Sequence, residues 1–198
     1  MFTGIIEALG QVTEVVESGT NRTFWIDSPL SSMFSIDQSV AHDGVCLTVE
    51  EVRGSQHRVT AVLETLEKTA LNQWQEGKQV NLEQSLLPSK RLDGHFVQGH
   101  VDTTGTCEQI EDKNGSWEFR FGFPEQFAPL VIEKGSISLN GTSLTIFEVG
   151  EDTFKVAVIP YTFEHTTMKF LQVSDKVNLE FDMIGKYISR KLELSKPA

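Results

Sequence analysis

The sequence predicts an all-β protein built from two copies of one domain. Its apolar segments are short, rich in β-branched and aromatic residues, and separated by Gly, Asn, Asp and Pro, which is typical of antiparallel strands in a sandwich or barrel. Blocks of the first half recur in the same order in the second half, so a whole domain is repeated. Helical spacing of apolar residues is clearest at the end of the chain, which predicts one C-terminal helix.

Composition and charge indicate a folded, acidic protein. The 198 residues are 39% hydrophobic and 23% charged, with 13 phenylalanines. The formal net charge of −11 should repel polyanions, so nucleic acid and anionic membranes are not expected partners. The N-terminus lacks the features of a signal peptide, and no segment approaches the roughly 20 apolar residues of a membrane span. Cys46 and Cys107 have neither disulfide nor zinc-ligand spacing, so we expect no metal and a cytoplasmic location.

The internal repeat holds one offset over three blocks. Each recurs 97 positions later: residues 80–83 (VNLE) as 177–180, 41–52 as 138–149, and 64–71 as 161–168. Near the starts of the copies the offset is 95, with Gly4 opposite Gly99, which implies two extra residues later in the second copy. We therefore expect a first domain over residues 1–94, including a Pro- and Gly-containing linker at 88–94, and a second over 95–182.

Several segments within the copies have a clear secondary-structure preference. The expected strands are residues 58–63, 79–83, 136–139, 142–149 and 154–159. Residues 127–134 fit a short helix. In residues 183–198, apolar side chains recur at Ile184, Tyr187, Ile188 and Leu192 with Lys and Arg between them. This tail is expected to form an amphipathic helix, docked on its own domain or serving as an oligomerisation surface.

Four segments resemble riboflavin synthases. They are residues 1–7 (MFTGIIE), 44–49 (GVCLTV), 94–102 (GHFVQGHVD) and 140–145 (NGTSLT). Each alone is weak evidence, but four in order on a duplicated chain are specific, and the likeness runs nearly from end to end. The resemblance implies two tandem six-stranded Greek-key β-barrels with a C-terminal α-helix. It also implies a homotrimer and an association with lumazine synthase.

The resemblance further implies a reaction. Two molecules of 6,7-dimethyl-8-ribityllumazine dismutate, one giving a four-carbon unit to the other, and the products are riboflavin and 5-amino-6-(D-ribitylamino)uracil. Neither a metal nor a redox cofactor is needed. Two related barrels suit two identical substrates held face to face, and such positioning is worth about 7 to 11 kcal/mol of barrier. In the family, the productive pair forms between the first barrel of one subunit and the second barrel of a neighbour.

Four residues are expected to carry the chemistry. Cys46 and Ser143 occupy the same place in the two copies, each before Leu-Thr, and the resemblance places both beside C7 of a lumazine. This location is favoured over covalent attack by Cys46, and a buried strand thiol is the ordinary alternative. His100, with an unperturbed pKa of about 6.5, is a candidate to move a proton of the 7-methyl group, and a surface histidine is equally consistent. Asp182 could orient Ser143 or a water.

The resemblance also implies substrate-binding residues in both copies. In the first copy they are Gly4, Ile5, Ile6, Cys46, Leu47, Thr48, Thr60, Ala61, Val62, Leu63, Glu64 and Thr65. In the second copy they are Gly99, His100, Val101, Lys134, Ser143, Leu144, Thr145, Ala157, Val158, Ile159, Pro160, Tyr161 and Thr162. The polar pairs 64–65 and 161–162 are expected at strand ends, where they would suit the ribityl polyol or be ordinary solvated turns.

One position departs from the family pattern. Asn140 precedes a glycine where the family often has Asp, whereas Asp43 stands where Asn is common. An amide cannot act as a general base, so activity would fail if a carboxylate at position 140 were required, whereas recognition by the backbone would survive.

Two other functions fit parts of the pattern. A non-catalytic lumazine or flavin carrier, like the antenna proteins of luminous bacteria, shares the fold but loses the pairing motifs in one half. This chain keeps polar site residues in both halves, which favours the enzyme. A flavin-dependent reductase would need a nucleotide-binding domain, and the sequence has neither a GxGxxG motif nor room for one.

Overall fold

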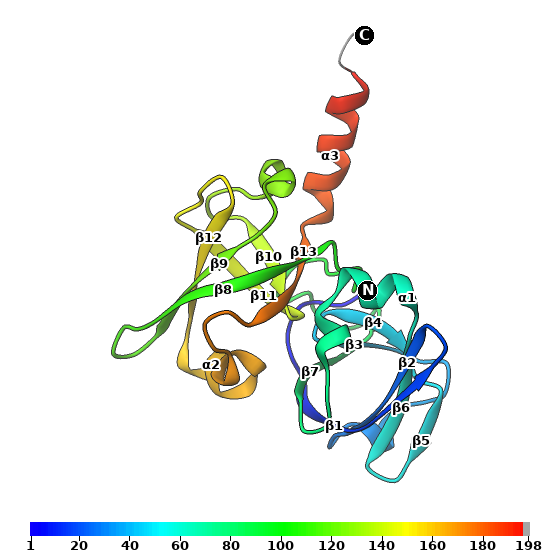
Figure 1. The fold of residues 1–198 in the computed structure, drawn as a ribbon. Helices are drawn as coiled ribbons and strands as arrows, with labels where there is room; N and C mark the ends of the chain where they lie inside the picture. Colours follow the sequence, from blue (N-terminus) through cyan, green and yellow to red (C-terminus); the bar gives the residue numbers. More distant parts are fainter. Residues whose placement is uncertain (196–198) are drawn as a thin grey trace.

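Two β-structures lie side by side in the computed structural model, which describes residues 1–195, and a helix projects from the second (Figure 1). The first copy contains β1 (Ala8–Ser18), β2 (Asn21–Asp27), β3 (Ser39–His42), β4 (Val45–Thr48), β5 (Glu51–Arg53), β6 (Gln56–Ala61), α1 (Leu63–Lys68) and β7 (Gln79–Gln84). The second contains β8 (Thr103–Asp112), β9 (Trp117–Gly122), β10 (Ser136–Leu139), β11 (Thr142–Phe147), β12 (Thr153–Val158), α2 (Pro160–His165) and β13 (Lys176–Phe181), followed by α3 (Met183–Leu194). Short 3-10 helices lie at Ser31–Met33, Ala70–Gln73, Glu125–Leu130 and Thr167–Phe170.

The second copy is a closed six-stranded barrel. Its strands pair in the order β10-β11-β12-β9-β8-β13, and β13 pairs in turn with β10. Because the chain crosses over after β9, that strand pairs with β12 and not with β10, which gives the Greek-key connection. The expected six-stranded barrel is confirmed here.

The first copy has the same topology with one interruption. Its seven strands run in the order β4-β3-β7-β1-β2-β6-β5, and the sheet is not closed. The chain stops pairing with β3 and starts pairing with β6 at Val49 and Glu50, whose N–H groups donate to Gln38 and Arg58 respectively. In the second copy the single strand β11 pairs with both neighbours. The expected pair of barrels is therefore confirmed, with the difference that this barrel is open and has seven strands, because the strand corresponding to β11 is divided into β4 and β5.

The five expected strands are confirmed, with ends shifted by at most two residues. The helix expected over residues 127–134 is instead the 3-10 helix Glu125–Leu130, which contains Pro129. Beyond it, Lys134 adopts a positive φ of 63° and donates its N–H to Ile146, so the chain there belongs to the edge of the barrel. The C-terminal helix is confirmed as α3, and residues 196–198 of the expected range lie outside the described part of the chain.

The repeated asparagine of the VNLE motif joins the two copies. Asn81 donates to the carbonyl of Asn140 at 2.9 Å, and Asn178 donates to the carbonyl of Asp43 at 2.8 Å, so the two bonds mirror one another. Gly44 and Gly141 touch at the same interface, where a Cβ on Gly44 would lie 2.7 Å from the nitrogen of Gly141. Both asparagines are almost fully buried. A side chain at either glycine would separate the copies.

Asp43 and Asn140 do the same work in the two copies. Each adopts a positive φ, 44° and 45°, and each accepts a backbone N–H, from Asn81 at 2.8 Å and from Asn178 at 2.7 Å. Short polar side chains tolerate this left-handed backbone and can bond locally. An amide oxygen is a sufficient acceptor, so the asparagine at position 140 is explained by structure and needs no catalytic carboxylate.

We predict opposite stability effects of Asp43→Asn and Asn140→Asp. Burial raises the pKa of Asp43 from 3.8 to about 6, although Lys78 and the bond from Asn81 act to lower it. The folded state therefore loses stability as pH rises through this window, by up to about 3 kcal/mol. Urea unfolding should show Asp43→Asn more stable than the parent at pH 8 and Asn140→Asp less stable. Both differences should shrink at pH 4, and equal effects at the two pH values would contradict the assignment.

A buried polar cluster distinguishes the first core from the second. Nε2 of His42 lies 2.8 Å from Nε2 of His57, whose Nδ1 lies 2.7 Å from the hydroxyl of Ser31, and all three residues are fully buried. At the repeat offset of 97 the second copy has Leu139, Phe154 and Ala128, which join its phenylalanine-rich core.

We predict that this cluster makes the protein sensitive to acid. Burial holds the pKa of His57 at about 4 and that of His42 well below 6.5, so both are neutral when folded. Unfolded histidines gain protons below about pH 6.5, so stability is present above that pH and is lost as pH falls, by about 2 kcal/mol at pH 5 from His57 alone. Urea unfolding at pH 7.5 and pH 5 should show a smaller loss for the double variant His42→Leu, His57→Phe than for the parent. The same loss in both proteins would refute the prediction.

Candidate functional site

Each copy begins with a segment that precedes its first strand, residues 1–7 before β1 and 96–102 before β8. These two leading segments pair with each other and then cross. Phe2 and Val97 exchange both backbone hydrogen bonds, at 2.7 and 3.2 Å. Beyond this bridge, the carbonyl of Gly99 accepts the N–H of Cys46 at 2.8 Å, and the carbonyl of Gly4 accepts the N–H of Ser143 at 2.8 Å. Each copy's leading segment is therefore attached to a strand of the other copy, β4 with Cys46 or β11 with Ser143, and these two are called the site strands.

The two glycines at these contacts cannot carry side chains. Gly4 and Gly99 have φ values of +79° and +81°, which favour glycine. A Cβ on Gly4 would lie 2.5 Å from Cβ of Ser143, and a Cβ on Gly99 would lie 2.7 Å from Cβ of Cys46. The close approach sets the backbone directly beside the two residues expected at the reacting centre.

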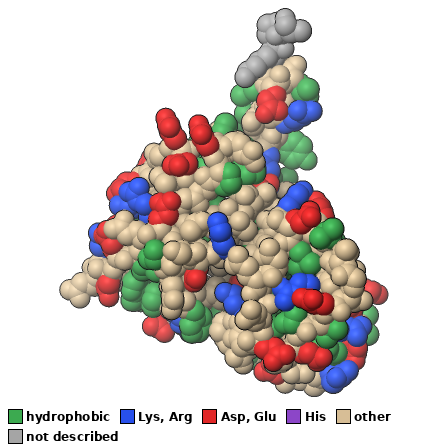
Figure 2. Space-filling model, viewed as in Figure 1, with side chains coloured by type: hydrophobic (Ala, Val, Ile, Leu, Met, Phe, Trp, Pro, Cys, Tyr) green, Lys and Arg blue, Asp and Glu red, His purple; other side chains and the backbone are tan. Residues whose placement is uncertain are grey.

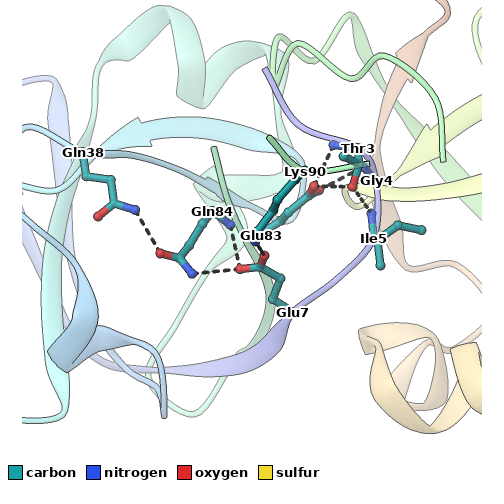
Figure 3. Close-up of polar contacts among 8 residues, drawn as sticks. All are labelled: Thr3, Gly4, Ile5, Glu7, Gln38, Glu83, Gln84 and Lys90. Carbon is teal, nitrogen blue, oxygen red and sulfur yellow. Dashed lines mark hydrogen bonds and ion pairs between the residues drawn. The ribbon is translucent and has the colours of Figure 1, made fainter. Parts of the chain in front are cut away.

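The repeated glutamates of the VNLE motifs hold the leading segments in place. Glu83 accepts the N–H groups of Thr3 at 2.6 Å and Gly4 at 3.0 Å (Figure 3). Glu180 accepts those of Gln98, Gly99 and His100, at 2.6 to 2.9 Å. Burial raises the pKa of both carboxyl groups, and the backbone bonds oppose that rise. The repeat of this motif is visible in the sequence, but its role appears only in the structure.

A cavity of about 380 Å³ lies at the Cys46 crossing. This size falls in the usual range for small-molecule sites, about 300 to 1,000 Å³. Among the expected site residues it is lined by Cys46, Glu64, Thr65, Gly99, His100 and Val101. It is also lined by Val45, Lys68, Thr69, Asp102 and Lys186, which the sequence analysis did not single out. The cavity thus combines the first barrel, the leading segment of the second and the base of α3.

The polar pairs expected at strand ends lie in short helices instead. Glu64 and Thr65 are in α1, where Glu64 forms a 2.7 Å ion pair with Lys68 one turn later. Tyr161 and Thr162 are in α2, which begins at Pro160. Proline suits the first turn of a helix because its fixed φ is helical and it has no N–H to satisfy there. The strand-end expectation is therefore wrong, although Glu64 and Thr65 do reach the cavity.

A histidine not selected from the sequence contacts Ser143. Nδ1 of His95 lies 2.6 Å from the hydroxyl of Ser143, and burial lowers the pKa of His95 while Asp182 acts to raise it. A neutral imidazole beside a hydroxyl can accept its proton. Asp182 itself caps α3 by accepting the N–H of Ile184 at 2.9 Å. The only signal for His95 was the Gly-His pair of residues 94–95, repeated at 99–100.

The remaining expected binding residues do not line the cavity and fall into four groups. Leu47, Ala61, Leu144 and Val158 are buried in the barrel cores. Thr48 and Thr145 are exposed at matching positions, opposite Ser39 and Ser136. The hydroxyl of Thr60 forms hydrogen bonds with Thr23 and Glu50. Nζ of Lys134 lies 5.3 Å from the centre of the Phe147 ring. Exposed apolar side chains occur at Ile5, Val62, Leu63, Ile159 and Tyr161. Ile6, Ala157, Pro160 and Thr162 are not among the residues that line the cavity.

The second cysteine, Cys107, is free and buried in the core of the second barrel. Burial raises the pKa of Cys107 to about 11, with Asp175 adding to the rise, so this thiol remains protonated at neutral pH.

Within residues 1–195, we find no helix that is both long enough and apolar enough for a membrane span.

Comparison with known families gives the class of protein first. The lumazine binding domain matches the chain twice, over residues 3–85 and 98–182, so this is a protein with two lumazine-binding repeats.

Full-length relatives then give the family. The riboflavin synthase of Bacillus subtilis is 37% identical over 97% of this chain and 90% of its own length. That of Schizosaccharomyces pombe is 38% identical over 98% and 94%, and that of Brucella abortus is 36% identical over 99% and 100%. The chain belongs to the riboflavin synthase family.

Solved structures show the same fold in more distant proteins. LumP complexed with riboflavin superimposes with a TM-score of 0.87 at 19% identity, covering 92% of this chain and 100% of LumP. LumP complexed with 6,7-dimethyl-8-(1'-D-ribityl) lumazine gives 0.85 at 18% identity, covering 92% and 99%. At these identities the likeness concerns the fold alone.

Proposed function

We propose that this chain catalyses the riboflavin synthase reaction, the dismutation of two 6,7-dimethyl-8-ribityllumazine molecules to riboflavin and 5-amino-6-(D-ribitylamino)uracil. The observation that carries the proposal is end-to-end similarity, at 36 to 38% identity, to riboflavin synthases of bacteria and a yeast. The cavity at Cys46 has the volume and polar lining expected for one substrate. The reciprocal crossing of Gly4 and Gly99 supports two related substrate positions.

The proposal assigns a role to each of the main site residues. His100 on the cavity wall is the group that moves the proton of a 7-methyl group, and Cys46 lies beside the electrophilic C7 of the same lumazine. At the second position, Ser143 takes the place of Cys46, and His95 accepts the proton of its hydroxyl. Asp182 favours the protonated form of His95 by its charge. Glu64 and Thr65 bind the ribityl hydroxyls.

The backbone supplies most of the positioning. Glu83 and Glu180 fix the leading segments, and the Gly4 and Gly99 contacts fix those segments against the site strands. Such preorganisation lowers the entropy cost of bringing two reactants together. Removal of a methyl proton and addition at C7 then take place between groups that are already in place.

We expect anaerobic incubation of the purified protein with 6,7-dimethyl-8-ribityllumazine to form riboflavin and the aminopyrimidine in equal amounts. Absorbance of riboflavin and separation of the products by chromatography would measure the reaction. Tight binding without product would instead indicate a carrier of the LumP type. In this assay Cys46→Ser should retain turnover to within about tenfold, because Ser143 already supplies a hydroxyl at the related position. A loss of several thousandfold with unchanged binding would instead make the thiol essential.

We further infer a cytoplasmic homotrimer assembled through α3, with lumazine synthase as a partner. Figure 2 shows the outer part of α3 projecting beyond the barrels, with apolar side chains along it. Ile184, Ile188 and Leu192 are each more than half exposed and line a groove with Leu130 and Ile132. An exposed apolar stripe of this kind is typical of an interface. The partner is supported by the family resemblance, and the location by the two free cysteines, Cys46 and Cys107.

Removal of residues 183–198 is predicted to convert the trimer to monomers while both barrels stay folded, since the last strand ends at Phe181. Sedimentation velocity would measure the assembly state, and circular dichroism would serve as the folding control. A truncated protein that still sediments as a trimer would count against α3 as the interface.

A further inference from the structure

An acid–lysine pair follows each leading segment. After Gly99 and His100, Oδ2 of Asp102 accepts the N–H of Phe181 at 2.9 Å and lies 2.6 Å from Nζ of Lys186. Phe181 ends β13, and Lys186 is in the first turns of α3. This carboxylate of the leading segment therefore bonds both the last strand of the second copy and the helix that follows.

The first copy contains the corresponding pair. Glu7 accepts the N–H of Gln84 at 3.3 Å and lies 2.9 Å from Nζ of Lys90 (Figure 3). At the repeat offset of 97, Gln84 corresponds to Phe181. Burial acts to raise the pKa of Glu7, but hydrogen bonds from Lys90 and Gln84 hold it below its usual value. The recurrence of this arrangement indicates a shared structural device.

The two pairs differ in exposure and in what they adjoin. The side chains of Lys186 and Asp102 are 25% and 19% exposed, whereas those of Lys90 and Glu7 are 52% and 26% exposed. Water and salt weaken exposed pairs more than sheltered ones, so the second pair is the stronger restraint. Asp102 and Lys186 also line the cavity, together with Gly99, His100 and Val101.

We propose that Lys186, acting through Asp102, is a positioning residue that holds the Gly99–Val101 wall of the cavity and ties ligand affinity to the seating of α3. The ligand's identity rests on the proposed function, but the restraint on the wall does not. Glu180 accepts the N–H groups of Gly99 and His100, and Asp102, just beyond them, is bound to the N–H of Phe181. Loss of the Lys186 charge removes the ion pair that fixes the Asp102 carboxylate and so weakens the second of these restraints.

The charge of the same carboxylate also acts on Lys68, which lines the cavity as well. The pKa of Lys68 is raised, first by its hydrogen bond to Glu64 and further by the charge of Asp102. Without Lys186, Asp102 would compete with Glu64 for Lys68. The wall would then be looser and the rim more negative, so a preorganised site would become one that the ligand must order on binding.

The test compares Lys186→Met and Asp102→Asn with Lys191→Met. Asn at position 102 can still accept the Phe181 N–H but cannot form the ion pair. Lys191 is exposed on the same helix, and no ion pair to it is found within residues 1–195, so its replacement controls for loss of a helix charge. Sedimentation velocity on each variant separates effects on assembly from effects on the cavity.

The first measurement is hydrogen exchange of the peptide covering residues 97–102 without ligand. Exchange should become about three- to tenfold faster in Lys186→Met and Asp102→Asn and stay within about twofold of the parent in Lys191→Met and Lys186→Arg. The double variant should be no faster than either single variant, because both break one interaction. Equal acceleration in Lys191→Met, or no rescue by arginine, would overturn the proposal.

The second measurement is the affinity for 6,7-dimethyl-8-ribityllumazine by fluorescence titration. It should fall by about three- to tenfold in the two pair-breaking variants, with a matching rise in KM and kcat within about twofold. Unchanged affinity, or a fall in kcat alone, would overturn the link to the ligand. If the parent formed no riboflavin, the proposed function would fail, yet exchange and binding would still decide this inference.

Discussion

The structure depends on a reciprocal exchange of backbone hydrogen bonds between the two copies. The carbonyl of Gly99 binds the N–H of Cys46, and the carbonyl of Gly4 binds the N–H of Ser143. The exchange requires glycine at both positions and buried carboxylates at Glu83 and Glu180 to hold the segments. Neither copy therefore possesses a complete site alone, which gives a physical reason for keeping the two copies in one chain.

The same VNLE motif serves the interface and the site at once. Its asparagine bridges the copies, and its glutamate, two residues later on the same face of the strand, holds a leading segment. Strand geometry explains the division, since residues two apart point to the same side and reach neighbouring parts of one interface. One motif consequently contributes both to the contact between the two barrels and to the construction of the site.

The two copies share this design but differ inside. The first core contains the buried pair His42 and His57, whereas the second is filled by phenylalanine rings such as Phe121 and Phe154. The strand of the first copy that corresponds to β11 is also divided at Val49 and Glu50, so that barrel is open where the other is closed. The cavity lies on the side of the more polar, interrupted copy, where adjustment to a ligand costs less packing energy than in a closed apolar barrel.

The sequence by itself determined the duplication, five of the strands, the terminal helix, the family and the equivalence of Cys46 with Ser143, because these depend on local pattern and on matching residues at a constant offset. Only the tertiary structure decided that His100 stands with Cys46 and that His95 stands with Ser143. Alignment of the repeats matches each residue of one copy with its equivalent in the other. It carries no information on whether a leading segment binds its own barrel or the other one. That choice is made by contacts between residues some 50 to 140 positions apart, which leave no periodic signal in the chain.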